Sequence, residues 1–223
     1  AGVEHVVFER GRVGETWRHR WDTFCLVTPN WTMRLPGRPY NGSDPHGFMP
    51  RDKIVAALED YAGAFAAPVR EGVTAAGVES SPDGGFVVHT TAGDFSSRAL
   101  VLATGAFQRP HRPAAAGTLP TGLSQIDINT YQNERALQPG KVLVVGSGQS
   151  GAQISEELRE AGREVVLACG KAAWIPRRLG GHDIVWWLVQ VGFFDQTIGA
   201  LPSPTARLAA NPMATGHGVG HNL

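Results

Sequence analysis

The chain has 223 residues, of which 42% are hydrophobic, and its 20 basic side chains balance its 20 acidic ones. This length can form one large or two modest domains, and the balanced charge argues against a nucleic-acid or acidic-membrane partner. No apolar run is long enough to cross a membrane and no signal peptide opens the sequence, so a cytoplasmic protein is expected. The sequence leaves a monomer and a homodimer both open.

The first strand is expected at residues 6–8, with Glu9 at its carboxyl end. Residues 51–66 place apolar side chains on one face, which is typical of an amphipathic helix. A parallel strand so close to Ala1 needs a partner earlier in the chain, and residues 216–223 complete no element. We therefore expect a fragment that is truncated at both ends.

A small β-meander is expected between residues 69 and 102. Its strands are predicted at residues 69–73, 85–91 and 94–102, with turns at Asp83-Gly84 and Ala92-Gly93. The last strand contains the nearly continuous apolar run 99–103, which is typical of a buried strand.

A second unit begins at Lys141, after a turn-rich stretch that follows Pro110 and Pro113. Strands are expected at residues 142–145 and 164–168, on either side of an amphipathic helix at 150–161. Residues 183–201 are rich in aromatic and apolar side chains, and their helical spacing favours core packing over a ligand platform.

The most informative motif lies between the first strand and the helix of this unit. It reads Gly146-Ser147-Gly148-Gln149-Ser150-Gly151, the GxGxxG pattern of dinucleotide-binding folds. Gly146 allows the tight turn, Gly148 lets a pyrophosphate approach the backbone, and Gly151 lets helix and strand pack closely. The amides of the helix N-terminus then face the phosphates. The alternative is a glycine-rich turn that binds no ligand.

The type of nucleotide is suggested by the residues that follow the second strand. An NAD site usually has an acidic residue there, but this sequence has none. Lys171 and Arg177 follow instead, and cations suit the 2′-phosphate of NADPH, although Arg177 could also belong to a solvated face. Glu9, by contrast, ends a strand and suits a ribose with free hydroxyls, as in FAD, although an acid at that place is also common on surfaces.

Cysteine and histidine spacings suggest no metal or disulfide chemistry. Cys25 and Cys169 lie far apart and are expected to be free, buried thiols. His217 and His221 are separated by a glycine-containing loop sequence, which does not favour a metal site.

In its motif order the chain resembles flavin-containing monooxygenases and their bacterial CzcO-like relatives. The matching residues are Gly14-Glu15-Thr16-Trp17-Arg18, Trp21-Asp22, Leu26, Thr28-Pro29, Phe48, Arg51, Ala103-Thr104-Gly105 and the glycine motif. The resemblance implies an α/β, FAD/NAD(P)-binding Rossmann-like flavoprotein with two dinucleotide-binding domains. Residues 1–112 would form a partial FAD-binding domain with the meander, 113–140 a linker, and 141–223 an incomplete NADPH-binding domain.

The resemblance also implies cofactor contacts. For FAD they are Glu9, Trp17, Arg18, Asp22, Thr28, Val73, Ala103, Thr104 and Gly105. For NADPH they are the six residues of the glycine motif, with Lys171 and Arg177 as the cations. The implied reaction is oxygenation of a soft nitrogen or sulfur nucleophile by molecular oxygen through a C4a-hydroperoxyflavin.

Two departures from the family pattern leave alternatives open. The first glycine loop is missing, so this chain is expected to bind FAD poorly or not at all. The inter-domain signature, FxGxxxHxxxY in the family, keeps counterparts of its glycine and of its tyrosine, Tyr131, but has Asp127 where relatives tend to have His. A flavin reductase without oxygen transfer, and a non-catalytic NADPH-binding redox module, therefore remain alternatives.

Overall fold

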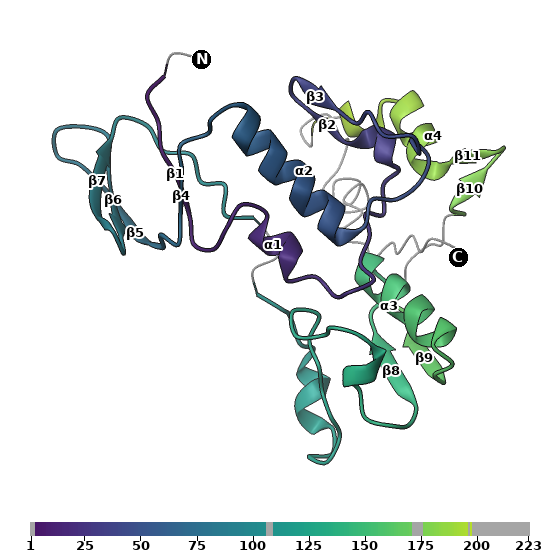
Figure 1. Ribbon diagram of the computed structural model, residues 1–223. Coiled ribbons are helices and arrows are strands. Elements are labelled where there is room, and N and C mark those ends of the chain that lie inside the picture. Colours follow the sequence, from purple (N-terminus) through teal and green to yellow (C-terminus); the bar gives the residue numbers. More distant parts are fainter. Residues whose placement is uncertain (1–2, 106–108, 171–175, 196, 198–223) are drawn as a thin grey trace. The chain divides into compact units, whose positions relative to one another are not determined.

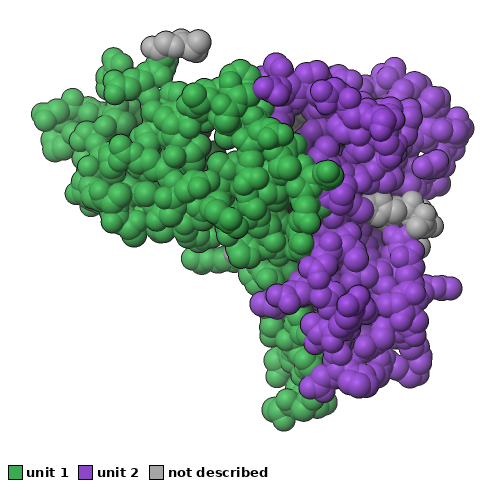
Figure 2. All heavy atoms as spheres, viewed as in Figure 1, with its two compact units in different colours: residues 1–20, 51–129 green, residues 21–50, 130–223 purple. Residues whose placement is uncertain are grey.

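A computed structural model describes residues 3–105, 109–170, 176–195 and 197 (Figure 1). Its chain divides into two compact units, which Figure 2 distinguishes by colour. Unit 1 comprises residues 1–20 and 51–129, and unit 2 comprises residues 21–50 and 130–223. None of the helices that the structure describes is suited in length and hydropathy to cross a bilayer.

Unit 1 contains the first strand and the long helix that the sequence predicts. Strand β1 (Val7–Glu9) pairs in parallel with β4 (Val69–Glu71). Between them lie the short helix α1 (Glu15–Arg18) and the helix α2 (Arg51–Ala64), which buries Ile54 and Val55. Gly14 precedes α1 with a φ of 79° and packs against Val55, so a larger residue would be strained there.

The meander of unit 1 differs in part from the prediction. It consists of β5 (Ala75–Ser80), β6 (Phe86–Thr90) and β7 (Gly93–Ser97), all antiparallel. The sequence did not predict β5 as a strand, and β4 pairs with β1 instead of joining the meander. The expected buried strand at 99–103 is wrong: these residues are outside any strand, and Val101 and Leu102 are 86% and 75% exposed. A strand needs a hydrogen-bonding neighbour, and no described strand pairs with this run. A single 3-10 turn, Ala114–Thr118, follows in the same unit.

Unit 2 contains the strand–helix–strand element that the sequence predicts. Strands β8 (Val142–Val145) and β9 (Val165–Ala168) are parallel and in direct register, joined by α3 (Gln149–Glu160). The helix packs on both strands through its apolar face, which buries Ala152 and Leu158. Gly162 ends it in the left-handed conformation, at a φ of 80°.

The other described elements of unit 2 are short. They are the 3-10 turn Asn30–Thr32, the hairpin β2 (Arg34–Leu35) and β3 (Arg38–Pro39), the turn Glu134–Ala136, the hairpin β10 (Arg178–Leu179) and β11 (His182–Asp183), α4 (Ile184–Gln190) and the turn Phe193–Asp195. Asp183 caps α4 by accepting the amide of Val185 at 2.9 Å. Trp186 and Trp187 are half-buried and meet edge to face, with ring centroids 4.8 Å apart.

Candidate functional site

The glycine motif has the conformation that its three glycines predict. Gly146 leaves β8 with a φ of 106°, a value that favours glycine. A Cβ on Gly151 would lie 1.8 Å from the carbonyl oxygen of Gly146, so only glycine lets α3 pack this closely on the end of β8. Gly148 is the opposite case, because a Cβ there would meet nothing within 4 Å. The space above Gly148 is therefore open.

The polar groups of the motif are arranged for an anionic ligand. The first amides of α3, from Gln149 onwards, lack partners inside the helix and carry the positive end of its dipole. Gly148 sits at the N-cap with no side chain to cap the helix. The side-chain oxygen of Gln149 is buried and has no hydrogen-bond partner in the described part of the chain. Ser147 is also buried, and Ser150 is half-buried. The helix amides and the two serine hydroxyls can donate to a dinucleotide pyrophosphate, whereas the Gln149 oxygen is an acceptor and cannot.

Of the two cations expected after β9, the structure describes one. Lys171 lies outside the described residues, as do His217 and His221. Arg177 is described and is buried, with a side chain only 4% exposed. Its Nε lies 2.7 Å from Oδ2 of Asp183, and its guanidinium carbon stands 4.5 Å from the ring centroid of Phe48. Burial lowers the pKa of Arg177, and Asp183 opposes that shift. Nη1 and Nη2 have no hydrogen-bond partner among the described residues.

Neither cysteine forms a disulfide, and only one of them is shielded from solvent. Cys25 is half-buried, and burial raises the pKa of its thiol. Cys169 is exposed directly after β9, so the expectation that it is buried is wrong. The strand ends at Ala168, and Cys169 therefore leaves the sheet. Within the described ranges no three His, Cys, Asp or Glu side chains gather into a metal site.

In unit 1, the residues expected to hold the FAD ribose and adenine come together at the ends of β1 and β4. Oε1 of Glu9 accepts the amide of Gly11 at 2.8 Å, which orients its carboxylate at the end of β1. The amide of Val73 donates to the carbonyl oxygen of Glu9 at 3.0 Å. The pairing of β1 with β4 thus brings two residues together that are far apart in sequence.

The other expected FAD contacts of unit 1 are more dispersed. Trp17 and Arg18 lie on α1, both half-buried, and Arg18 binds the carboxylate of Glu59 and donates to the carbonyl oxygen of Val13 at 3.2 Å. Ala103, Thr104 and Gly105 are exposed and belong to no strand. Gly105 has a φ of 78°, which favours glycine.

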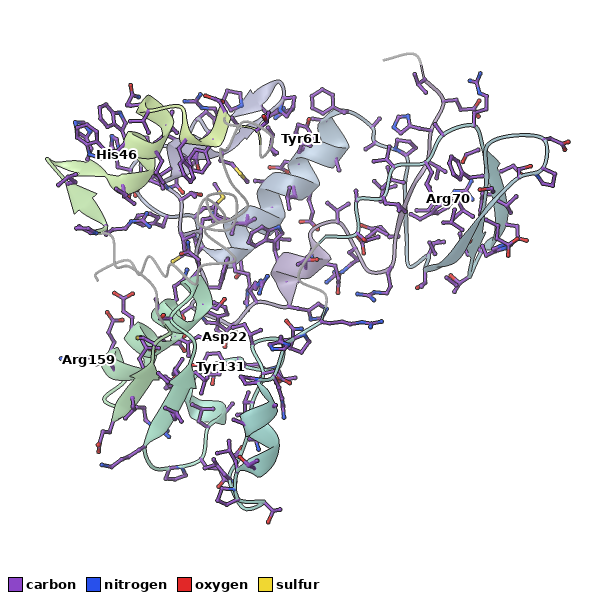
Figure 3. All side chains as sticks on the ribbon, turned by 180° about the vertical axis from the view of Figure 1, so that it is seen from behind. Asp22, His46, Tyr61, Arg70, Tyr131 and Arg159 are labelled. Atoms are coloured by element: carbon purple, nitrogen blue, oxygen red, sulfur yellow. The ribbon has the colours of Figure 1, made fainter. Side chains whose placement is uncertain are left out.

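In unit 2, Asp22 is exposed and Thr28 half-buried, on the segment that follows the buried Trp21. The amide of Asp22 donates to the carbonyl oxygen of Gln132 at 2.9 Å, and Nδ2 of Asn133 donates to Oδ2 of Asp22 at 2.8 Å. Figure 3 labels Asp22 and Tyr131, which lie close together beside α3. This segment therefore reaches the helix that begins at the glycine motif.

Two residues of the inter-domain signature have clear partners, each within its own unit. Asp127, in unit 1, receives both Nε and Nη2 of Arg112, at 2.7 and 2.8 Å, and this lowers the pKa of its carboxyl group. Tyr131, in unit 2, is 6% exposed, and its hydroxyl donates to Oε1 of Glu157 at 2.9 Å. Burial and the Glu157 carboxylate raise the pKa of Tyr131. No sequence motif marks Glu157, which occupies an ordinary polar position of α3.

The strand, glycine turn and helix have the form of a dinucleotide-binding element, and comparison with known proteins shows the family. The family model for pyridine nucleotide-disulphide oxidoreductases matches residues 1–182, and the chain belongs to this family. An uncharacterized CzcO-like oxidoreductase of Geobacillus kaustophilus is 38% identical over 196 residues, 87% of this chain and 56% of the relative. An indole-3-pyruvate monooxygenase of rice, YUCCA4, is 34% identical over 211 residues, 85% of this chain and 48% of the relative. These relatives confirm the predicted resemblance.

A solved structure supports the fold. The flavin-containing monooxygenase from Stenotrophomonas maltophilia matches 96% of this chain and 68% of its own, with a TM-score of 0.65 at 19% identity. The predicted Rossmann-like α/β flavoprotein fold is therefore confirmed. The chain spans about half the length of the curated relatives it matches, between 48% and 56% for the two named above.

Proposed function

We propose that this protein is an FAD-dependent oxidoreductase that uses NADPH, and that residues 146–151 bind the NADPH pyrophosphate. The observation that carries the proposal is the contrast between two glycines of one loop. Gly151 is packed so closely that no side chain fits, whereas the space above Gly148 is open and adjoins the free amides of α3. A pyrophosphate approaching Gly148 would receive those amides.

Selectivity for NADPH over NADH is assigned to the cations after β9. Nη1 and Nη2 of Arg177 carry no partner in the described part of the chain, but both atoms are buried, so they can donate to a 2′-phosphate only after this side chain becomes exposed. Lys171 is the second proposed cation. No acidic side chain follows β9 to bind a free 2′-hydroxyl, since the strand ends in Ala168 and is followed by Cys169 and Gly170.

The proposed FAD contacts follow the family resemblance, residue by residue. Oε1 of Glu9 accepts the amide of Gly11, and Oε2 is the atom proposed to bind a ribose hydroxyl. The amide of Val73 is bound to Glu9, so the carbonyl oxygen of Val73 is the backbone group proposed to contact the adenine. The remaining proposed contacts are Trp17, Arg18, Asp22, Thr28, Ala103, Thr104 and Gly105. When bound, the flavin accepts hydride from NADPH and passes the electrons to oxygen.

Oxygenation of a small organic substrate is the proposed outcome, with molecular oxygen as co-substrate. A soft nitrogen or sulfur nucleophile is the first substrate class to test. A 2-oxo acid is the second, because the rice relative is named for indole-3-pyruvate. The alternative is a reductase that releases hydrogen peroxide. One observation favours the reductase. Asp127 stands where relatives tend to have a histidine, and its carboxylate is paired with Arg112.

The visible absorption spectrum tests the proposal. Because this chain alone is expected to bind FAD poorly, the product of the whole natural coding sequence is purified, mixed with FAD, freed of excess flavin, and titrated anaerobically with NADPH and, in a separate sample, with NADH. We expect a bound flavin band that NADPH bleaches faster than NADH and that air restores. A protein that retains no flavin would contradict the proposal. Oxygen uptake matched by substrate oxidation indicates a monooxygenase, whereas uptake matched by hydrogen peroxide indicates the reductase.

A further inference from the structure

One carboxylate on α3 holds two hydroxyl groups from distant parts of the chain. Oε1 of Glu157 accepts from the hydroxyl of Tyr131 at 2.9 Å, and Oε2 accepts from Oγ1 of Thr23 at 2.5 Å. Hydrogen bonds to an ionised carboxylate are stronger than those between neutral groups. Glu157 therefore joins the segment after Trp21 and the end of the inter-domain signature to one helix.

A second side chain of α3 reinforces this junction. Gln153 lies one helical turn before Glu157 and is 5% exposed, and its Nε2 donates to the carbonyl oxygen of Cys25 at 3.1 Å. We call Thr23, Tyr131, Gln153 and Glu157 the α3 clasp. Every member is in unit 2.

The clasp lies against a buried aromatic pair. Trp21 is 1% exposed and Tyr131 is 6% exposed, with their ring centroids 6.5 Å apart. The hydroxyl of Tyr131 is part-buried at that depth, with the carboxylate of Glu157 as its hydrogen-bond acceptor. If Glu157 lost its carboxylate, this buried hydroxyl would be left without its acceptor, which is unfavourable. Trp21 also begins the segment that carries Asp22 and Thr28.

We propose that Glu157 is a positioning residue, which holds the segment carrying Asp22 and Thr28 at a fixed place on the helix that binds the NADPH pyrophosphate. The inference rests on the proposed function, in which Asp22 and Thr28 lie beside the isoalloxazine. The same helix carries the glycine motif at its first turn and the clasp in its later turns. Glu157 therefore sets how the flavin-facing segment is placed relative to the nicotinamide nucleotide, and touches neither cofactor.

Hydrogen exchange of the free protein tests the clasp without any cofactor. The amides of Asp22 and Leu26 are both hydrogen-bonded, to Gln132 and Met49, and report on the segment. In Glu157→Ala we expect their exchange to accelerate about tenfold, while the amides of α2 in unit 1 keep their protection. Glu160→Ala is the matched control, because Glu160 is exposed at the end of the same helix. Unchanged exchange at Asp22 and Leu26, or an equal increase throughout the protein, would overturn the proposal.

The conservative variant separates positioning from bulk stability. In Glu157→Gln the amide oxygen still accepts from Tyr131 and the amide nitrogen donates to Oγ1 of Thr23, so segment protection should return to within about threefold of the wild type. With FAD bound, the maximal rate of flavin bleaching should fall about tenfold in Glu157→Ala and recover in Glu157→Gln. The NADPH concentration at half-maximal rate should stay the same, because the glycine motif is intact. A changed half-saturation with an unchanged maximal rate would contradict positioning.

These measurements distinguish the two proposals. If the wild-type protein takes up no flavin, the proposed function fails, and the exchange experiment still decides whether Glu157 orders the segment. If flavin is bleached by NADPH at the same rate in Glu157→Ala as in the wild type, the positioning role fails and the proposed function stands.

Discussion

A single methyl group at position 151 would test the packing that shapes the glycine motif. In Gly151→Ala, the new Cβ would lie 1.8 Å from the carbonyl oxygen and 3.0 Å from the carbonyl carbon of Gly146, and both atoms are backbone. Relief requires α3 or the end of β8 to move by about 1.5 Å, since carbon–oxygen contacts relax near 3.3 Å. Overpacking of this kind lowers the free energy of unfolding by about 1–3 kcal/mol. The higher helix propensity of alanine offsets about 0.5–1 kcal/mol of that loss.

We therefore expect Gly151→Ala to lower the free energy of unfolding by about 1–2 kcal/mol and to abolish NADPH binding. Gly148→Ala is the matched control. Gly148 has a φ of −71° and open space around its Cβ position, so its unfolding free energy should change by less than about 0.5 kcal/mol. The methyl group would nevertheless occupy the space proposed for the pyrophosphate, and NADPH binding should fall.

Urea unfolding, compared at a constant m-value, measures the change in unfolding free energy. Calorimetric titration with NADPH measures the change in nucleotide affinity. Wild-type stability in Gly151→Ala would refute the packing argument. Unchanged NADPH affinity in Gly148→Ala would refute the placement of the nucleotide.

Three further predictions concern stability and titration away from the cofactors. Leu158 is fully buried, so Leu158→Ala should lower the unfolding free energy by about 2–5 kcal/mol in urea. A hydrogen bond from Nδ1 of His89 to Oδ1 of Asp94 raises the pKa of His89, so this hydrogen bond stabilises the fold at low pH and its contribution is lost as pH rises through the folded-state pKa. Asp94→Asn should lower that pKa in an NMR titration, and an unchanged value would contradict the assignment. The raised pKa of Tyr131 means that stability should decline as pH rises above 10.0, and Tyr131→Phe should remove that part of the decline in alkaline unfolding curves.

Local sequence patterns were sufficient for the core of the nucleotide-binding element. The apolar run of β8, the three glycines and the amphipathic period of α3 act within one stretch of chain, so each is readable without knowledge of the fold. The roles predicted for Gly146 and Gly151 in the turn and the packing are confirmed by a φ of 106° and by a Cβ position 1.8 Å from backbone. The binding roles of the site residues, and the division of the chain at 112 and 140, stay predictions.

The features that sequence reasoning missed depend on neighbours. The run 99–103 has the composition of a buried strand, yet a strand also needs a partner, and no described strand pairs with it. The strand β5 is the reverse case, a strand with a partner but without a strand-like sequence. Its residues, Ala-Ala-Gly-Val-Glu-Ser, have little β propensity, and pairing with β6 imposes the extended conformation. Glu157 gives no signal because its partners, Thr23 and Tyr131, come from other parts of the chain.

The most direct test of the central claim is a calorimetric titration of the wild-type protein with NADPH and with NADH under the same conditions. We expect one NADPH site and binding at least about tenfold tighter than that of NADH, because a 2′-phosphate gains charge-assisted hydrogen bonds of about 1.5–3 kcal/mol each. No binding of either nucleotide would contradict the assignment of residues 146–151. Equal affinity for both would contradict the proposed role of Lys171 and Arg177.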